Sequence, residues 1–244
     1  MFVLSAPSKI INTEANYINT LFSLLLKDEN FSFINKSRVN VMISNQYEKA
    51  VDIRGIDDSV CNIKLHQPDY ESYINLSYEE RKRWQIETAY IALKELFIVK
   101  QWNVTYLDKL KSNILNNIHS IAIPMLKKEK KNKHYFVMVT LIPDIDKNTF
   151  CATFSDSKHE IWKVNFFEGY PLFLYWKRFF SSFDWIGDNV FKITDAKKEF
   201  SFVFDVSLQQ YSINIESSSK DEFDILKFID SWRCTSKTPM FEGV

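Results

Sequence analysis

Residues 200–206 read FSFVFDV, and this stretch decides the fold of the second half of the chain. Phe200, Phe202, Phe204 and Val206 alternate with polar Ser201 and Asp205, which is the period of a β-strand with one buried face. After a short turn, the alternation resumes at Tyr211, Ile213 and Ile215. The sequence therefore predicts neighbouring strands that share a dry face.

Further strands are predicted upstream of this pair. They cover residues 121–126, 134–142, 149–154 and 160–166, and the short polar turns between them favour antiparallel pairing. A helix is expected next, because Pro171 suits a first helical position and apolar residues follow at helical spacing: Leu172, Trp176, Phe179, Phe180 and Phe183. The capping-box sequence Ser219–Glu222 predicts a last helix that covers the dry face with Ile225, Ile229 and Trp232.

The first half mixes helices and strands. Tyr17, Leu21 and Leu24 indicate an amphipathic helix over residues 13–27, and strands are expected at 39–43, 51–53 and 60–65. A second capping box, Ser77–Glu80, begins a helix that is expected to run to about Gln101. A shorter helix is predicted after Thr105, with its apolar residues pointing inward: Leu107, Leu110 and Ile114.

Strand groups followed by helices define an α+β fold. We expect largely antiparallel sheets, with a β-meander in the C-terminal half, packed against about five helices. The chain is interpreted as a single domain, 1–244. A subdivision near residue 117 is the alternative, with a mixed helix and hairpin part at 1–117 and an antiparallel sheet with two helices at 118–244.

The composition indicates the cellular location of the protein and argues against two classes of partner. The 31 basic and 31 acidic side chains cancel, which argues against a nucleic-acid coat protein and against a polybasic membrane-surface protein. Three cysteines are odd in number and far apart, which is typical of reduced thiols in the cytoplasm. The N-terminus has no basic segment before its short apolar run, and no apolar stretch approaches membrane-spanning length. We expect a soluble cytoplasmic protein.

The chain contains only four glycines, which lie singly. A glycine-rich loop is what brings backbone amides close to phosphates, so both the dinucleotide fingerprint and the phosphate-binding loop are missing. The four histidines have no zinc-ligand spacing, and no cysteine is placed beside a histidine on one strand face. The sequence predicts no cofactor and no metal, and it favours a protein that is not an enzyme.

One pattern points the other way. Pro143-Asp144 followed by Asp156-Ser157-Lys158 looks like the proline–aspartate, acid-x-lysine signature of a large nuclease superfamily. In that chemistry two carboxylates hold a divalent cation and the lysine helps to activate water. Asp144 and Asp156 are expected at opposite ends of a hairpin strand, about 24 Å apart at roughly 3.4 Å per residue, which is too far to share an ion.

A lysine run occupies the turn after the first predicted strand of the second half. Lys127, Lys128, Lys130 and Lys131 could contact phosphate or an acidic protein surface. Alternatively, they are solvated residues that keep a sheet edge from pairing with other molecules. Neither arginine nor an aromatic residue interleaves with them, which favours the second interpretation.

Asp184-Trp185-Ile186-Gly187-Asp188 places a tryptophan in a short acidic loop, where it is hard to bury. Partly exposed aromatic residues flanked by charge are typical anchors of protein interfaces, and Tyr170 is a similar candidate. Our first hypothesis is a non-enzymatic protein that binds another protein, such as an immunity protein or antitoxin, an anti-defence factor or an assembly adaptor. The alternatives are a divergent metal-dependent nuclease or hydrolase using Asp144, Asp156 and Lys158, and nucleic-acid binding through the lysines.

Overall fold

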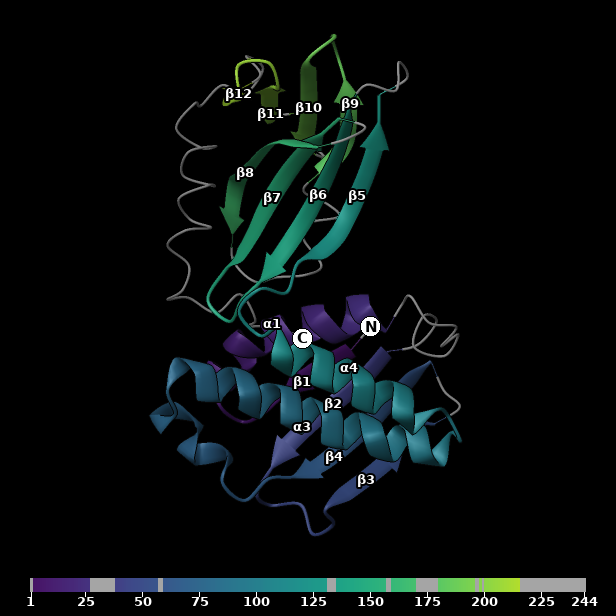
Figure 1. Cartoon of the computed structure of the whole chain (residues 1–244). Coiled ribbons are helices and arrows are strands. Elements are labelled where there is room, and N and C mark those ends of the chain that lie inside the picture. The colour runs from purple at the N-terminus through teal and green to yellow at the C-terminus, as the bar shows by residue number, and fades with distance from the viewer. Residues whose placement is uncertain are drawn as a thin grey trace. The chain divides into compact units, whose positions relative to one another are not determined.

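A computed structural model describes residues 2–26, 38–56, 59–130, 135–156, 159–169, 180–195, 198 and 200–215. The chain divides into two compact units, Met1–Ile121 and Ala122–Val244. Figure 1 shows helices and strands mixed in the first unit and strands in the second.

The first unit holds a four-stranded sheet in the order β1-β2-β4-β3. Its strands are β1 (Phe2–Ser5), β2 (Arg38–Ser44), β3 (Val51–Arg54) and β4 (Val60–His66). β1 and β2 are parallel, and so are β2 and β4, whereas β3 runs antiparallel to β4. The expected strands at 39–43, 51–53 and 60–65 are confirmed, and Val39, Val41 and Ile43 are buried as the alternation requires.

The helix α1 (Lys9–Leu25) covers the free edge of β1. The Phe2 amide donates to Ser23 Oγ at 2.9 Å, and the Leu4 amide donates to Asn19 Oδ1 at 2.7 Å. These two backbone donors would otherwise lack a partner, because an edge strand has neighbours on one side only. Tyr17 and Leu21 are fully buried, so the amphipathic helix predicted here is confirmed, although the side chain of Leu24 is not described.

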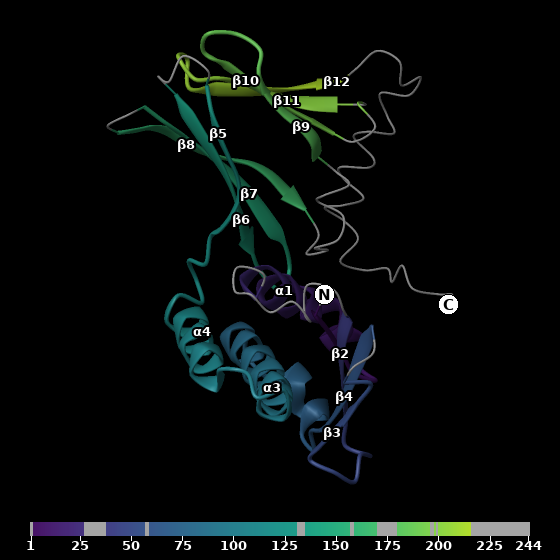
Figure 2. The same cartoon turned by 90° about the vertical axis from the view of Figure 1, so that its right-hand side faces the viewer.

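The 3-10 helix η1 (Tyr70–Asn75) leads into α3 (Tyr78–Val99), which is followed by α4 (Val104–Asn116). The predicted capping box is present: the Glu80 amide donates to Ser77 Oγ, and the Ser77 amide donates to Glu80 Oε2 at 2.8 Å. Hydrogen bonding to Ser77 also lowers the pKa of Glu80. Leu107, Leu110 and Ile114 of α4 are buried, as expected. Figure 2 shows α3 and α4 to one side of the sheet.

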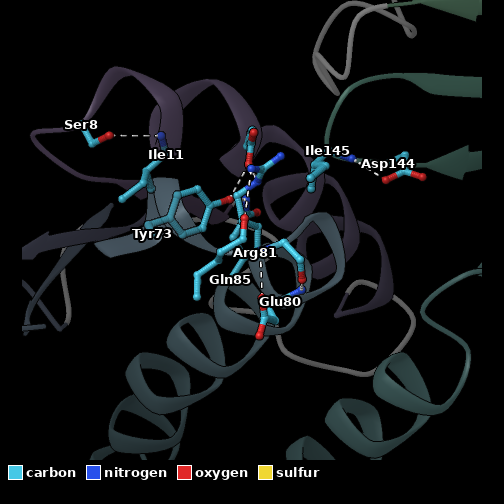
Figure 3. Close-up of polar contacts among 11 residues, drawn as sticks. Ser8, Ile11, Tyr73, Glu80, Arg81, Gln85, Asp144 and Ile145 are labelled. Carbon is cyan, nitrogen blue, oxygen red and sulfur yellow. Dashed lines mark hydrogen bonds and ion pairs between the residues drawn. The ribbon is translucent and has the colours of Figure 1, made fainter. Parts of the chain in front are cut away.

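A buried polar network joins α1, η1 and α3 (Figure 3). The Tyr73 hydroxyl donates to Glu14 Oε2 at 2.5 Å and accepts from Gln85 Nε2 at 2.6 Å. Arg81 Nε lies 3.1 Å from the same Glu14 oxygen. Tyr73 is only 2% exposed. Burial, followed by the hydrogen bond to Glu14, holds the pKa of Tyr73 far above its ordinary value.

The second unit contains two four-stranded antiparallel meanders (Figures 1 and 2). The first consists of β5 (Ile123–Glu129), β6 (Phe136–Pro143), β7 (Asn148–Ser155) and β8 (Glu160–Gly169) in sequential order. The second consists of β9 (Phe180–Trp185), β10 (Val190–Asp195), β11 (Phe200–Asp205) and β12 (Gln210–Ile215). The antiparallel β-meander expected in the C-terminal half is confirmed.

Aromatic rings join the two sheets. Phe204 of β11 lies 5.4 Å from Phe154 of β7 and 5.2 Å from Phe166 of β8, measured between ring centroids. Phe180 of β9 lies 5.4 Å from Phe150 of β7. Offset and edge-to-face ring pairs at these separations add stabilisation to the burial of the apolar area. The predicted alternation at residues 200–206 is therefore the core of this unit.

One detail of the predicted fold is wrong, the expected number of helices is confirmed only in part, and two predicted segments are untested. Residues 180–185 form a strand, not the end of a helix, because Phe180 and Phe183 pair with β10. An apolar run this short fits either period, and the aromatic residues suit a sheet. Four helices occur among the described residues, three α-helices and one 3-10 helix, where about five were expected. The helix predicted from Ser219, and residues 172–179, lie outside the described residues.

Two of the side chains expected on the dry face of the last strand are exposed, and the helix predicted to cover them lies outside the described residues. Tyr211 and Ile213 of β12 are 40% and 46% exposed. β12 lies at the edge of its sheet, so these side chains have strand neighbours on one side only. Tyr211 stacks on Phe204, with ring centroids 5.8 Å apart, but this contact covers only part of the tyrosine. The buried face of the sheet ends at β11.

Candidate functional site

The lysine run and the acidic loop, which the sequence presents as separate candidates, meet in the second unit. Lys128 Nζ lies 2.5 Å from Asp184 Oδ1 and also donates to the carbonyl of Phe183. Lys130 Nζ lies 2.9 Å from Asp188 Oδ1 and 2.5 Å from the carbonyl of the same residue. The end of β5 is thus tied to the turn between β9 and β10.

These ion pairs hold the β9–β10 turn in position, but they add little to the free energy of unfolding. The Asp188 side chain is 93% exposed and that of Asp184 is 56% exposed, so water and salt screen both pairs. A hydrogen bond from Lys130, with its charge, lowers the pKa of Asp188. Since the folded-state pKa is depressed, the contact persists at neutral pH and is lost as the pH falls through that lowered value.

The other members of the lysine run contribute less. Lys127 is exposed, and its ammonium lies 5.7 Å from the centroid of the Phe136 ring. Lys131 lies outside the described residues, as does Tyr170. Two of the four candidate lysines therefore meet the acidic loop.

Trp185 is half-buried and belongs to the aromatic packing between the sheets. Its ring stacks on Tyr135 at 6.0 Å and contacts Phe191 at 5.2 Å and Phe154 at 6.2 Å. Its indole Nε1 is buried and has no hydrogen-bond acceptor among the described residues. Trp185 thus anchors the loop from within, while the next residue, Ile186, is 59% exposed.

Sequence reasoning missed Ile186. The sequence does contain a signal for its exposure, because an isoleucine in a short acidic turn has few apolar neighbours that could bury it. A second exposed apolar residue, Leu208, lies on the turn between β11 and β12 and is 64% exposed. The two turns are adjacent, since the Val206 amide donates to the Asn189 carbonyl at 2.8 Å.

The turn that carries Leu208 is held by its own hydrogen bonds. Asp205 Oδ1 accepts from the amides of Ser207 and Leu208, at 3.0 and 3.1 Å, and from the Ser207 hydroxyl at 2.6 Å. Hydrogen bonding, first from the Ser207 side chain, lowers the pKa of Asp205. Gln209 Nε2 also donates to the Ile161 carbonyl of β8 at 3.3 Å. We call the surface formed by Lys128, Lys130, Asp184, Trp185, Ile186, Asp188 and Leu208 the tip surface.

The candidate metal ligands do not come together. Asp144 follows β6, whose last residue pairs with Asn148 at the start of β7, whereas Asp156 follows the end of β7. The eight residues of β7 separate them, about 27 Å at roughly 3.4 Å per residue. Each carboxylate accepts a local backbone hydrogen bond, Asp144 from Ile145 at 2.7 Å (Figure 3) and Asp156 from His159 at 2.8 Å. Lys158 lies outside the described residues.

Other reactive side chains are buried or scattered. Cys61 and Cys151 are buried free thiols, and burial raises the pKa of Cys61. A thiol with a raised pKa is a poor nucleophile, because the thiolate is the reactive form. Within the described part of the chain, histidine, cysteine and acidic side chains form no cluster of three or more suited to a metal ion.

Comparison of the chain with protein-family models, with curated proteins and with solved structures finds no match. Among the described helices, none combines the length and apolar character needed to cross a membrane.

Proposed function

We propose that this protein works by binding another protein through the tip surface. The observation that carries the proposal is the exposure of Ile186 on a turn that two lysines hold in place. Isoleucine in water is unfavourable by about 1.5–3 kcal/mol relative to full burial, so a partner that covers the exposed part of Ile186 gains a corresponding part of that free energy.

The arrangement around Ile186 has the composition of a protein interface. Apolar Ile186 and Leu208 are bordered by charged Asp184, Asp188 and Lys130. Protein interfaces place apolar anchors inside a polar rim in this way. The ion pairs and the Trp185 anchor order the loop before a partner arrives, which lowers the entropy cost of binding. Masking a toxin, anti-defence activity and an adaptor role are all compatible with such a surface.

Replacing Ile186 with aspartate is expected to reduce capture of the partner at least about tenfold. The matched control is Ile74→Asp, because Ile74 is 58% exposed and lies on η1 in the first unit. Tagged wild-type and variant proteins are incubated with lysate of the source cells, and recovered proteins are quantified by mass spectrometry.

A protein that wild type and Ile74→Asp recover equally, and that Ile186→Asp recovers at least about tenfold less, is the expected result, since loss of one interface anchor costs about 1.4 kcal/mol or more. Equal recovery of every protein by both variants would contradict the proposal. Circular dichroism spectra of the two variants establish that both are folded.

A further inference from the structure

Edge strands expose unpaired backbone groups, and most of the edge strands in the described part of the chain are protected. In the first unit, α1 side chains cap the amides of β1, and β3 carries charged Asp52 and Arg54, whose side chains are 3.0 Å apart. In the second unit, β5 contains Pro124, and its register with β6 shifts beside that proline. The C-terminal end of β5 is also tied to the β9–β10 turn by Lys128.

The strands β8 and β9 are protected as well. β8 carries Glu160, Lys163 and Glu168, and its register with β7 shifts twice. In β9, the carbonyl of Phe183 accepts a hydrogen bond from Lys128, Asp184 adds a charge, and the register with β10 shifts near Asp195. Charges, prolines and bulges of this kind are what natural sheets use to prevent pairing between molecules.

β12 has none of these features. Its sequence, QYSINI, contains no charged residue and no proline. Its register with β11 is unbroken over all six pairs. Residues 210–214 are all exposed. Within the described residues, β12 is therefore an edge that is open to strand addition.

We propose that a second copy of the chain pairs with this edge, antiparallel, with a twofold axis at Ile213. In such a pair, directly opposite side chains lie on the same face of the sheet. Ile213 then faces its own copy and Tyr211 faces Ile215, while Ser212 faces Asn214 on the other face. The four-stranded sheet continues across the axis into that of the second molecule.

The absence of charge identifies a second copy as the occupant. Antiparallel self-pairing places each side chain opposite one from the same strand, so a strand with charge of one sign repels itself. β12 avoids this, and it matches apolar with apolar and polar with polar residues about Ile213. Pairing with a strand from a different protein would not require β12 to be uncharged or to match itself about Ile213.

The proposed dimer is tested by introducing a charged residue at position 213, which lies on the twofold axis. Ile213 is 46% exposed in the single chain, so a charged residue there leaves the fold intact. Ile213→Lys and Ile213→Asp each place like charges opposite each other and are expected to weaken the dimer about a hundredfold. Mixing the two variants replaces repulsion by attraction and is expected to restore a mixed dimer. Light scattering coupled to gel filtration gives the mass of each sample.

Wild type is expected at twice the chain mass of 28.9 kDa, each variant alone at the chain mass, and the mixture at twice that mass. Ile186→Asp serves as the control and is expected to remain dimeric, so failure here is distinct from failure of the tip surface. A monomeric wild type at hundreds of micromolar overturns the inference. Variants that remain dimeric, or a mixture that stays monomeric, overturn it equally.

Discussion

Replacing Phe204 with alanine is expected to lower the free energy of unfolding of the Ala122–Val244 unit by about 3–5 kcal/mol. Phe204 is fully buried and contacts rings of both sheets, including Phe154, Phe166 and Phe191. The smaller side chain leaves a cavity between sheets that cannot close completely, so ring contacts are lost as well as transfer free energy.

The loss is measured by urea unfolding, followed by the fluorescence of Trp162 and Trp185, which lie in the same aromatic cluster. Met138→Ala is the control, because Met138 is on the same unit but 37% exposed, and it is expected to cost less than about 1 kcal/mol. Equal effects of the two variants would mean that the aromatic contacts do not hold the sheets together.

Replacing Tyr73 with phenylalanine is expected to cost the first unit about 1.5–3 kcal/mol, the range for a hydrogen bond to a charged group. The substitution keeps the ring but removes the hydroxyl. The Glu14 carboxylate then loses one of its two partners and keeps only Arg81, and the Gln85 amide loses its acceptor. Tyr70→Phe, on the same 3-10 helix, is the control and is expected to change stability by less than about 0.5 kcal/mol.

The cost depends on pH in a defined direction. The folded state raises the pKa of Tyr73 above that of the unfolded chain. Its contribution is therefore fully present below about pH 10, the ordinary tyrosine pKa, and is lost as the pH rises further, since only the unfolded state releases the proton. The difference between wild type and Tyr73→Phe, measured by chemical unfolding at a series of alkaline pH values, should narrow above that pH. A constant difference would show that the hydroxyl is not held in its neutral form.

Local signals in the sequence were sufficient where the deciding contacts are local. The Ser77–Glu80 capping box involves residues three apart, and the strand at 200–206 follows from its own alternation. The meander of β5 to β8 follows from short turns, because they leave antiparallel pairing as the simple connection. These elements were predicted close to their observed bounds.

Contacts between residues far apart in the sequence could not be predicted from local patterns. The pairing of Phe180–Trp185 with β10 overrides a helical spacing, and no local pattern reveals it. β1 has only four residues, and its pairing partner begins at residue 38, after α1. The contact of Lys128 with Asp184 spans 56 residues, so the lysine run and the acidic loop were predicted as two separate surfaces, whereas the fold makes them one. Exposure of Ile186 and Ile213 likewise depends on which strands lie at edges and turns.

Site-specific photo-crosslinking in the source cells tests the tip surface most directly. A benzophenone side chain is introduced at position 186 in one sample and at position 74 in another, since both isoleucines are exposed to nearly the same extent. Position 186 is expected to form a covalent adduct with one protein that position 74 does not capture. The same adducts from both positions, or none from position 186, would contradict binding through the tip surface.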